Sequence, residues 1–412
     1  MNPILINLKR TFFTLLIVTQ ILLAASASQA QPYQTTAVQN SIVGDNLSRT
    51  ETTIQSGNNQ LDRFRMIEVS KAGVPNEALQ GVVLLVPPLA SGFHNYEASD
   101  NGDYNNSFAA FFARRNFAVV GFSPRQHGLT AGSCESGAID CAPMANWGLA
   151  TVLSDVTYIR QQITTKYPGL KVVIGGLSMG SVTGLAALNA HPNDYAGAIL
   201  IDGTIHDPDV NVRAVNAGFC SNLEALLAAG VYYDGQSGPG AKALSQVAQA
   251  APNAPLVFPG FPPGITNHQA FVLALSAPPV SPLTPRPGFY NIAGNFIEDR
   301  FFYANEALVH ANIATFYDYT PIRTMRDLNC GLAGETTFTN NLGSFNGPVI
   351  MFAGGHGFGS AMLATAQVLT SASVTINFKP DYGHVDYMFA QNHLQELEHP
   401  ILSWLLQQPF KQ

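Results

Sequence analysis

The stretch KVVIGGLSMGSVTGLAALNA, residues 171–190, decides the fold. Its first part is a short apolar run typical of a strand buried on both faces, and Met179 to Ala190 has the composition of a helix. Between them, Gly176-Leu177-Ser178-Met179-Gly180 fits the pattern G-x-S-x-G. A serine on such a sharp turn projects its hydroxyl above the sheet, and glycines are needed where side chains would strike the neighbouring elements. The context predicts a nucleophilic Ser178; the alternative is a chance glycine-rich turn.

The flanking sequence repeats the same alternation of strand and helix. Short apolar runs predict strands, and apolar residues at helical spacing predict the helices between them. The expected strands are opening strands within 52–70 and buried strands at 82–86, 117–122, 171–174, 197–201, 349–353 and 374–378; the expected helices lie at 105–115, 152–163, 179–190, 360–369 and up to 407. This pattern predicts an α/β protein with a mostly parallel sheet and helices on both faces.

The alternation breaks between His206 and Phe345, where glycine, proline and asparagine are abundant. Because strands and helices resume afterwards, we expect a large lid or cap inserted between a strand that ends near 202 and one that starts near 348. The predicted layout is a core at 50–204, the lid or cap at 205–346, and the rest of the core at 347–412. Aromatic residues of the insertion either line a pocket or form its own small core: Phe258, Phe261, Phe271, Tyr290, Phe301, Phe302 and Tyr303.

The first 30 residues have the layout of a secretory signal peptide. Lys9 and Arg10 precede the apolar run Thr11–Ala25, and Ser28-Gln29-Ala30 offers a cleavage site with small residues. The alternative is a retained membrane anchor, but the run is shorter than the roughly 20 residues that a spanning helix needs. We therefore expect residues 1–30 to be removed, leaving a secreted or periplasmic protein without a stable membrane anchor. The formal net charge of −7 argues against nucleic-acid binding.

Export makes the cysteines interpretable, because an even number in an exported chain favours disulfides. The four are Cys134, Cys141, Cys220 and Cys330, which permit three pairings. Pairing Cys134 with Cys141 would close a small loop and leave the other two to join the ends of the long insertion. No pair has CxxC spacing, so zinc or thioredoxin-like redox chemistry is not expected.

Two further motifs accompany the serine turn. They are Ser123-Pro124-Arg125-Gln126-His127-Gly128, which is similar to a D-x-R-G-x-G turn, and Gly383-His384-Val385-Asp386, which is similar to the histidine loop of lipases. Together with the serine turn, they make the chain resemble the α/β-hydrolase superfamily, in its lipase- and esterase-like branch. The resemblance covers residues 80–204 and 347–407 but not the insertion.

A serine hydroxyl is a poor nucleophile until a base takes its proton. The resemblance implies that His384, in a short loop after the last strand, is this base; the alternative is a surface loop histidine. His94, His127 and His356 also lie in loops at the same edge of the sheet. We expect these three to be hydrogen-bonded loop residues, with contact to substrate as the alternative.

The sequence departs from the family at the acid of the triad. The family usually places it after the strand at 349–353, but no Asp or Glu occurs between Val349 and Lys379. Some lipases that resemble this arrangement take the carboxylate from the end of the preceding strand, which here implies Asp202. It would hold the histidine tautomer and stabilise the imidazolium. The alternative is a structural Asp202, and the other candidates for the acid are Asp207, Asp209 and Asp381.

An oxyanion hole needs two backbone N–H groups aimed at the carbonyl oxygen. One is expected from Met179, the residue after the nucleophile. The other is expected from the loop Pro87-Pro88-Leu89-Ala90-Ser91-Gly92, where the family usually has His-Gly in place of the prolines. Since proline has no N–H, Leu89 is the first possible donor, at the position that the family uses.

These residues predict a secreted serine hydrolase that cleaves carboxylic esters through an acyl-enzyme, without cofactor or metal. The apolar insertion favours a hydrophobic or lipid-like ester as the small-molecule substrate, and we expect a monomer. The alternatives are a peptidase or amidase on the same triad, and a catalytically inactive, hydrolase-like binding protein. The absence of an acid in the usual loop favours the last alternative, and the intact serine turn argues against it.

Overall fold

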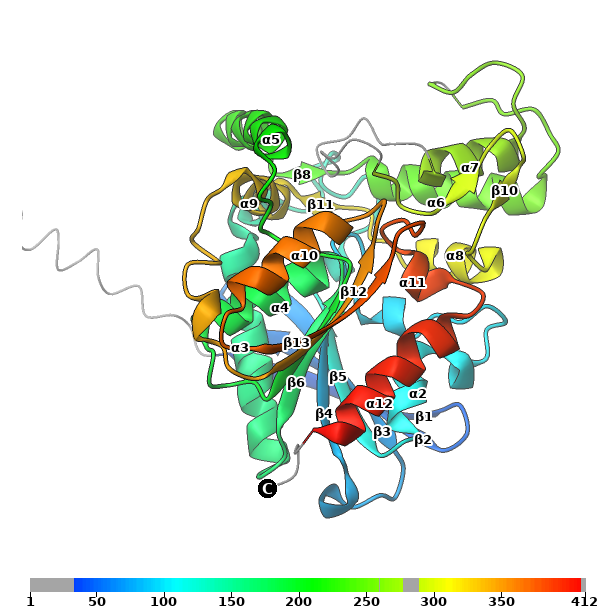
Figure 1. The fold of residues 1–412 in the computed structure, drawn as a ribbon. Coiled ribbons are helices and arrows are strands. Elements are labelled where there is room, and N and C mark those ends of the chain that lie inside the picture. The colour runs from blue at the N-terminus through cyan, green and yellow to red at the C-terminus, as the bar shows by residue number, and fades with distance from the viewer. Residues whose placement is uncertain (1–32, 259, 277–288, 409–412) are drawn as a thin grey trace, which may run out of the picture.

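The computed structural model describes residues 33–258, 260–276 and 289–408, so the predicted signal peptide lies outside the described residues. Nine strands form one sheet in the order β1-β2-β3-β5-β4-β6-β7-β12-β13 (Figure 1). They are β1 (Gln34–Val43), β2 (Leu47–Gln55), β3 (Arg63–Lys71), β4 (Gly81–Val86), β5 (Phe117–Ser123), β6 (Val172–Leu177), β7 (Gly197–Ile201), β12 (Pro348–Gly354) and β13 (Ser373–Lys379). β12 pairs directly with β7, although a long segment separates them in the sequence.

The sheet is parallel from β5 to β13, and β1 to β3 add an antiparallel edge. The central strands β4, β5, β6 and β7 are buried along their whole length. In this register Leu84 of β4 lies between Val120 of β5 and Ile174 of β6. Parallel strands covered on both faces are continuous apolar runs, which explains why the sequence located these four strands.

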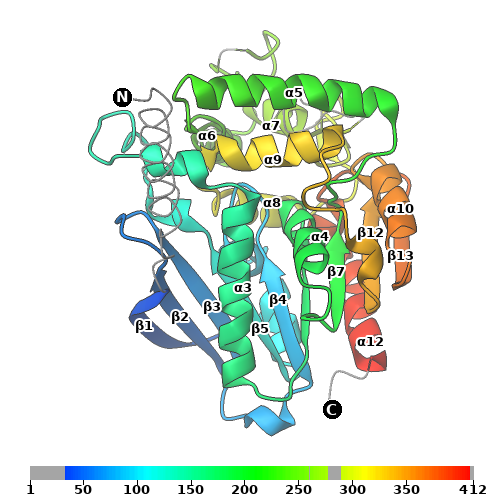
Figure 2. The ribbon, with the colours of Figure 1, turned by 90° about the vertical axis from the view of Figure 1, so that its left-hand side faces the viewer.

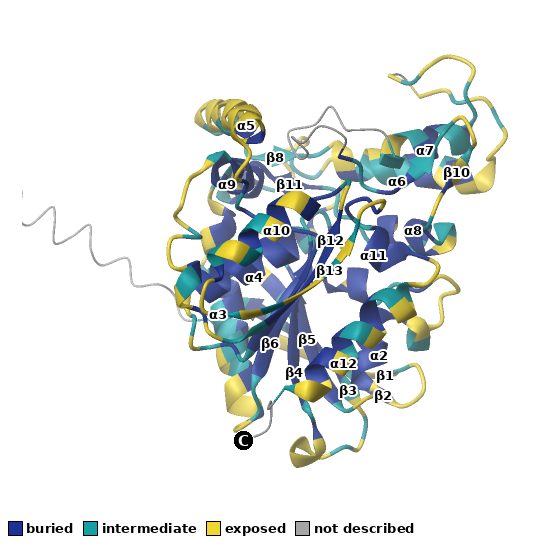
Figure 3. Ribbon diagram, viewed as in Figure 1, coloured by how far each residue is buried: buried dark blue, intermediate teal, exposed yellow. Residues whose placement is uncertain are grey.

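Helices cover both faces of the sheet (Figure 2). In Figure 1, one face carries α3 (Leu149–Lys166), α4 (Met179–Ala190) and α10 (Gly359–Val368), and the other carries α2 (Phe108–Ala113) and α12 (His399–Gln407). Alternate residues of β4 enter different cores: Leu84 packs with Val156 of α3, and Val83 belongs to the cluster that contains Phe112 and Ile401. The sheet therefore separates two hydrophobic cores, seen as dark blue layers in Figure 3.

The chain leaves the sheet after β7 and returns at β12. We call the intervening residues, 202–347, the β7–β12 segment. Its helices lie across the end of the sheet at the top of Figure 1 and are α5 (Val210–Ala228), α6 (Ser237–Ala250), α7 (Asn267–Ser276), α8 (Glu306–Ile313) and α9 (Ile322–Ala333). Two short antiparallel pairs accompany them: β8 (Tyr233–Asp234) with β11 (Thr320–Pro321), and β9 (Gly294–Asn295) with β10 (Arg300–Phe301).

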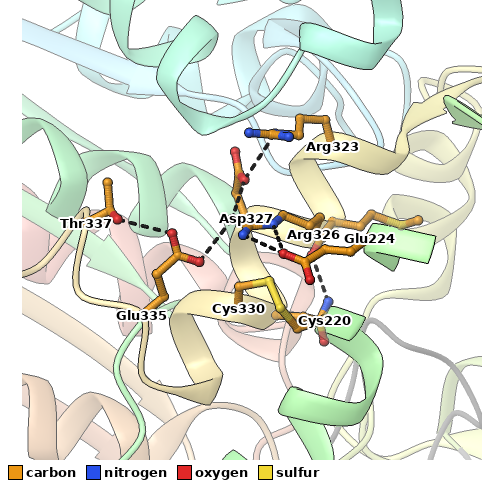
Figure 4. Close-up of a disulfide and its surroundings, with 10 residues drawn as sticks. Cys220, Glu224, Arg323, Arg326, Asp327, Cys330, Glu335 and Thr337 are labelled. Atoms are coloured by element: carbon orange, nitrogen blue, oxygen red, sulfur yellow. Dashed lines mark hydrogen bonds and ion pairs between the residues drawn. A yellow bond between two sulfur atoms is a disulfide. The ribbon is translucent and has the colours of Figure 1, made fainter. Parts of the chain in front are cut away.

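Two disulfides join the four cysteines. Cys134 pairs with Cys141, seven residues away, and Cys220 of α5 pairs with Cys330 of α9 across a sequence separation of 110. Around the second disulfide, Arg326 of α9 donates to Glu224 of α5 at 2.7 Å (Figure 4). The outermost helix, α5, is therefore tied to the rest of the segment by both a covalent bond and an ion pair.

The first strands differ from the sequence-based expectation. β1 and the start of β2 lie in a polar stretch before residue 52, and every residue of β1 except Val43 is exposed. A strand at an exposed edge has no apolar pattern to reveal it. Similarly, α5 is 19 residues long, although it lies in the segment where abundant glycine, proline and asparagine interrupt the alternation of strands and helices. α6 begins within the glycine-rich run near residue 237, with Pro239 in its first turn, where proline is tolerated.

Candidate active site

Ser178 lies on the turn between β6 and α4 with backbone angles φ 58° and ψ −118°. A positive φ is uncommon outside glycine and costs about 1–3 kcal/mol, so the surroundings must hold it. The Ser178 N–H donates to the carbonyl oxygen of Ile201 at 2.9 Å. The Ser181 hydroxyl accepts the Ile201 N–H at 2.7 Å and donates to the Gly176 carbonyl oxygen at 2.6 Å. These bonds fix the serine turn against the end of β7.

A buried tyrosine holds the same turn from the side of β4. The Tyr96 hydroxyl donates to the carbonyl oxygen of Val86 at 2.7 Å and accepts the N–H of Leu177 at 2.9 Å. Burial raises the pKa of Tyr96 well above its usual value, so the phenol remains a neutral donor and acceptor. Nothing in the sequence pattern pointed to Tyr96, because its role depends on packing between segments distant in the chain.

The structure brings Ser178, His384 and Asp202 into one chain of hydrogen bonds, which we call the relay. His384 Nε2 lies 2.7 Å from Ser178 Oγ, and His384 Nδ1 lies 2.7 Å from Asp202 Oδ2. The His384 side chain is almost buried and Asp202 is fully buried. This is the geometry in which an acid orients an imidazole so that its other nitrogen can accept a serine proton.

The glycine-rich loop after β12 surrounds the Asp202 carboxylate. Gly354 N–H donates to Oδ1 at 2.7 Å and Phe358 N–H donates to Oδ2 at 3.0 Å. A Cβ on Gly357 would collide with Oδ2 and with the backbone of His384. The loop in which the family usually carries its acid therefore supplies N–H donors and space to a carboxylate from the neighbouring strand. This arrangement accounts for Gly357 in physical terms.

Asp386 fixes the loop that carries His384. Its Oδ2 accepts the Gly383 N–H at 2.6 Å and the Ala293 N–H at 2.9 Å. Burial raises the pKa of Asp386 to about 6, against the lowering effect of these two donors. Asp386 belongs to the histidine motif of the sequence, but residue type and spacing indicated no role for it. The structure places it directly behind the histidine loop, one residue past the turn.

Met179 and Leu89, the expected oxyanion donors, face the cavity that contains Ser178. Met179 is the first residue of α4, so its N–H lies at the positive end of the helix dipole. Within the described part of the chain, neither backbone N–H makes a hydrogen bond with another group. Neither N–H group therefore has a competing partner among the described residues.

A cavity of about 230 Å³ opens beside Ser178 and His384. Its wall is mostly apolar, with Leu89, Met179 and Val182 from the core and Val309, Ile313 and Phe316 from the β7–β12 segment among its lining residues. None of the seven aromatic residues singled out from the insertion lines this cavity. Phe271 and Phe301 are buried in the core, whereas Phe258 and Phe302 are exposed. The cavity instead uses Phe289, Phe316, Phe358 and Phe389, which the sequence did not distinguish.

Comparison with known proteins agrees with this architecture. A family model described as "Serine aminopeptidase, S33" matches residues 92–232, and no curated protein matches the chain in sequence. A solved protein of Sulfolobus solfataricus that is named as a lipase superposes with a TM-score of 0.65 at 20% identity, covering 92% of this chain and 99% of that one. The chain is an α/β hydrolase in its fold. A thermostable carboxyl esterase from Bacillus coagulans gives a TM-score of 0.50 at 16% identity, covering 87% of this chain and 98% of that one.

The three other histidines expected near this edge of the sheet have separate partners. His94 pairs with Glu97 at 2.7 Å, and His127 Nδ1 lies 3.0 Å from the Pro124 carbonyl oxygen. Burial and the nearby Arg65 lower the pKa of His127 to about 4. The His356 ring stacks on Tyr290, with centroids 4.5 Å apart.

The other three candidates for the acid lie away from His384. Asp209 caps α5 by accepting the N–H groups of Asn211 and Val212. Asp207 accepts the Asp209 N–H at 3.0 Å, and Asp381 is exposed on a turn after β13. None of the three is hydrogen-bonded to His384, whose Nδ1 lies against Asp202.

Among the described residues, one group of side chains has spacing suitable for a metal ion, namely Cys220, Glu224 and Cys330. Its two sulfur atoms are joined in a disulfide, so they offer no thiolate (Figure 4). Among the same residues, no helix has both the length and the apolar character to cross a membrane.

Proposed function

We propose that this chain is a serine hydrolase that cleaves carboxylic esters with apolar chains through an acyl-enzyme. The observation that supports this function is the relay from Asp202 through His384 to Ser178, which opens into an apolar cavity. The strained backbone of Ser178 adds support, because a binding protein without catalytic chemistry has no use for such strain.

In the proposed reaction, His384 Nε2 takes the proton of the Ser178 hydroxyl as its oxygen attacks the ester carbonyl carbon. The N–H groups of Met179 and Leu89 bind the resulting oxyanion, and Asp202 stabilises the imidazolium. The imidazolium then gives its proton to the leaving alcohol, and an acyl-serine remains. Water attacks this ester with His384 as base again, which releases the acid and restores the serine.

The lining of the cavity favours an ester substrate over a peptide that is bound by its free amino terminus. An aminopeptidase must bind the protonated amine of its substrate, for which a buried carboxylate is the usual partner. No Asp or Glu is among the cavity-lining residues of the described chain, and most of the wall is aliphatic or aromatic. An apolar acyl or alcohol chain gains free energy in such a cavity, whereas an ammonium group would lose its hydration without compensation.

We further propose that the β7–β12 segment acts as the cap of the substrate site, since Val309, Ile313 and Phe316 contribute to the cavity wall. Two disulfides are compatible with export to an extracellular or periplasmic compartment, where such bonds persist.

Labelling with a fluorophosphonate probe tests the proposal. We expect covalent modification of the wild type and none of Ser178→Ala, with Ser154→Ala as a matched control because Ser154 lies on the exposed side of α3. Parallel assays with p-nitrophenyl esters and aminoacyl p-nitroanilides distinguish esterase from peptidase activity. A wild type that does not react with the probe would contradict the enzyme assignment, and preference for the anilides would contradict the ester.

A further inference from the structure

The apolar cavity beside Ser178 contains a polar group of residues that the proposed reaction does not use. Ser91 and Asn95 come from the chain that follows β4, and Asn312 comes from α8 on the opposite wall. All three are nearly inaccessible, at 0%, 2% and 3% exposure respectively. The core and the β7–β12 segment thus both contribute neutral polar side chains to the same cavity.

These side chains lack hydrogen-bond partners within the described chain. The unpartnered atoms are Ser91 Oγ, both Nδ2 and Oδ1 of Asn95, and Asn312 Nδ2. Buried polar atoms in folded proteins are nearly always paired, because an unpaired one has lost its hydration without replacement. Asn189, a buried asparagine outside the cavity, shows the paired arrangement: its side-chain Nδ2 donates to Asn340 Oδ1, and its Oδ1 accepts the N–H of Asn341.

We propose that Ser91, Asn95 and Asn312 form a polar subsite that binds a neutral, oxygen-bearing group of the substrate, namely a hydroxyl or a ketone carbonyl. This inference rests on the proposed ester hydrolysis at Ser178 and specifies its substrate class: an ester whose otherwise apolar chain carries a second oxygen function. In the proposed reaction, the N–H groups of Met179 and Leu89 bind the oxygen of the scissile carbonyl. The subsite therefore binds a different part of the substrate.

The chemistry of the subsite selects a neutral group. The two amides and the hydroxyl provide several donors, and Asn95 Oδ1 and Ser91 Oγ can also accept. Asp, Glu, Lys and Arg are absent from the cavity lining of the described chain, so a charged group would enter without a counter-charge. A plain alkyl chain would leave the polar atoms unpaired, and sites of this kind discriminate strongly against ligands that lack the matching polar group.

Matched ester series provide the test. One series consists of p-nitrophenyl hexanoates with a keto or hydroxyl group at successive carbons, and the other of butyrate esters of hexanol and its hydroxylated analogues. We expect the wild type to prefer one oxygenated member over its plain parent by about tenfold or more in kcat/KM. In Asn312→Leu and in Asn95→Leu, which replace the amide by an apolar group of similar size, this ratio should fall to about one.

Thermal stability separates a binding role from a structural one. Because Asn312→Leu removes an unpaired buried amide, we expect its melting temperature to equal or exceed that of the wild type. Asn189→Leu is the matched control: it removes a paired buried amide, so its melting temperature should fall while the substrate ratio stays at the wild-type value.

The outcomes distinguish this inference from the proposed function. If the wild type hydrolyses the plain ester in a Ser178-dependent manner but prefers no oxygenated member, the subsite is refuted and the esterase stands. Retention of the preference in both leucine variants would also refute it. If the wild type hydrolyses no member of either series, the esterase proposal fails and the subsite fails with it.

Discussion

Replacing Asp386 with asparagine removes a buried charge behind the His384 loop without removing the bonds that the side chain makes. Asp386 Oδ2 accepts both N–H groups, from Gly383 and Ala293, and Oδ1 has no partner within the described chain. An asparagine can therefore place its carbonyl oxygen at the Oδ2 position and its amide at the Oδ1 position. The two side chains then differ chiefly in charge.

The magnitude follows from the pKa of the carboxyl group. Burial raises the pKa of Asp386 from 3.8 to about 6, and a shift of about two units corresponds to about 3 kcal/mol. Because the folded state holds the proton more tightly than the unfolded state, this contribution is fully present below about pH 4 and is lost as the pH rises through about 6. Asparagine is neutral throughout, so the variant should be as stable as the wild type at about pH 4 and up to about 3 kcal/mol more stable at about pH 8.

Urea unfolding of wild type and Asp386→Asn at both pH values measures this difference. Asp381→Asn, which removes an exposed carboxylate from the same region, is the control and should show the same pH dependence as the wild type. A variant less stable than the wild type at the higher pH would refute the reasoning, because it would mean that the fold requires the ionised carboxylate.

Three further sets of substitutions test the relay, the loop around Asp202 and the Cys220–Cys330 disulfide. Asp202→Asn should lower kcat by about 10⁴, because an amide donating to His384 Nδ1 holds the tautomer that cannot accept the serine proton; ester hydrolysis within tenfold of wild type would exclude Asp202 as the acid. Gly357→Ala should lower kcat by at least about tenfold, since its Cβ meets the Asp202 carboxylate, and unchanged kinetics would contradict the close packing of this loop. Replacing Cys220 and Cys330 with alanine should lower the free energy of unfolding by about 4 kcal/mol, as measured by urea unfolding, and a loss below about 1 kcal/mol would show that the cross-link constrains little.

The sequence predicted the buried parts of this fold well. Met179–Ala190 and Gly197–Ile201 have the predicted bounds, because buried parallel strands and the helices that cover them are marked by apolar composition. β1 was not predicted, because all of its residues except Val43 are exposed and no apolar pattern therefore marks it as a strand. The helices of the β7–β12 segment were underestimated, because glycine and proline near residue 237 suggested loops.

The residues of the relay could be predicted from the sequence, because the carboxyl ends of parallel strands meet at one edge of the sheet. The serine turn and the histidine loop follow β6 and β13, and Asp202 follows β7, so topology alone places them near one another. The roles of Tyr96, Asp386 and Asn312 could not be predicted from the sequence. Their roles depend on which atoms of distant segments are paired and which are left unpaired, and residue type and spacing do not encode this.

The relay also determines when reactivity can arise during folding. Ser178 and His384 are 206 residues apart, and Asp202 and His384 are 182 apart. The bonds between them require β12 and β13 to have docked beside β7, which is slow because long stretches of chain must be ordered first. A nascent polypeptide that has formed only its earlier strands would expose the bent serine without a proton acceptor. Under the proposed function, ester hydrolysis is therefore expected only after the last strands have been translated and have joined the sheet.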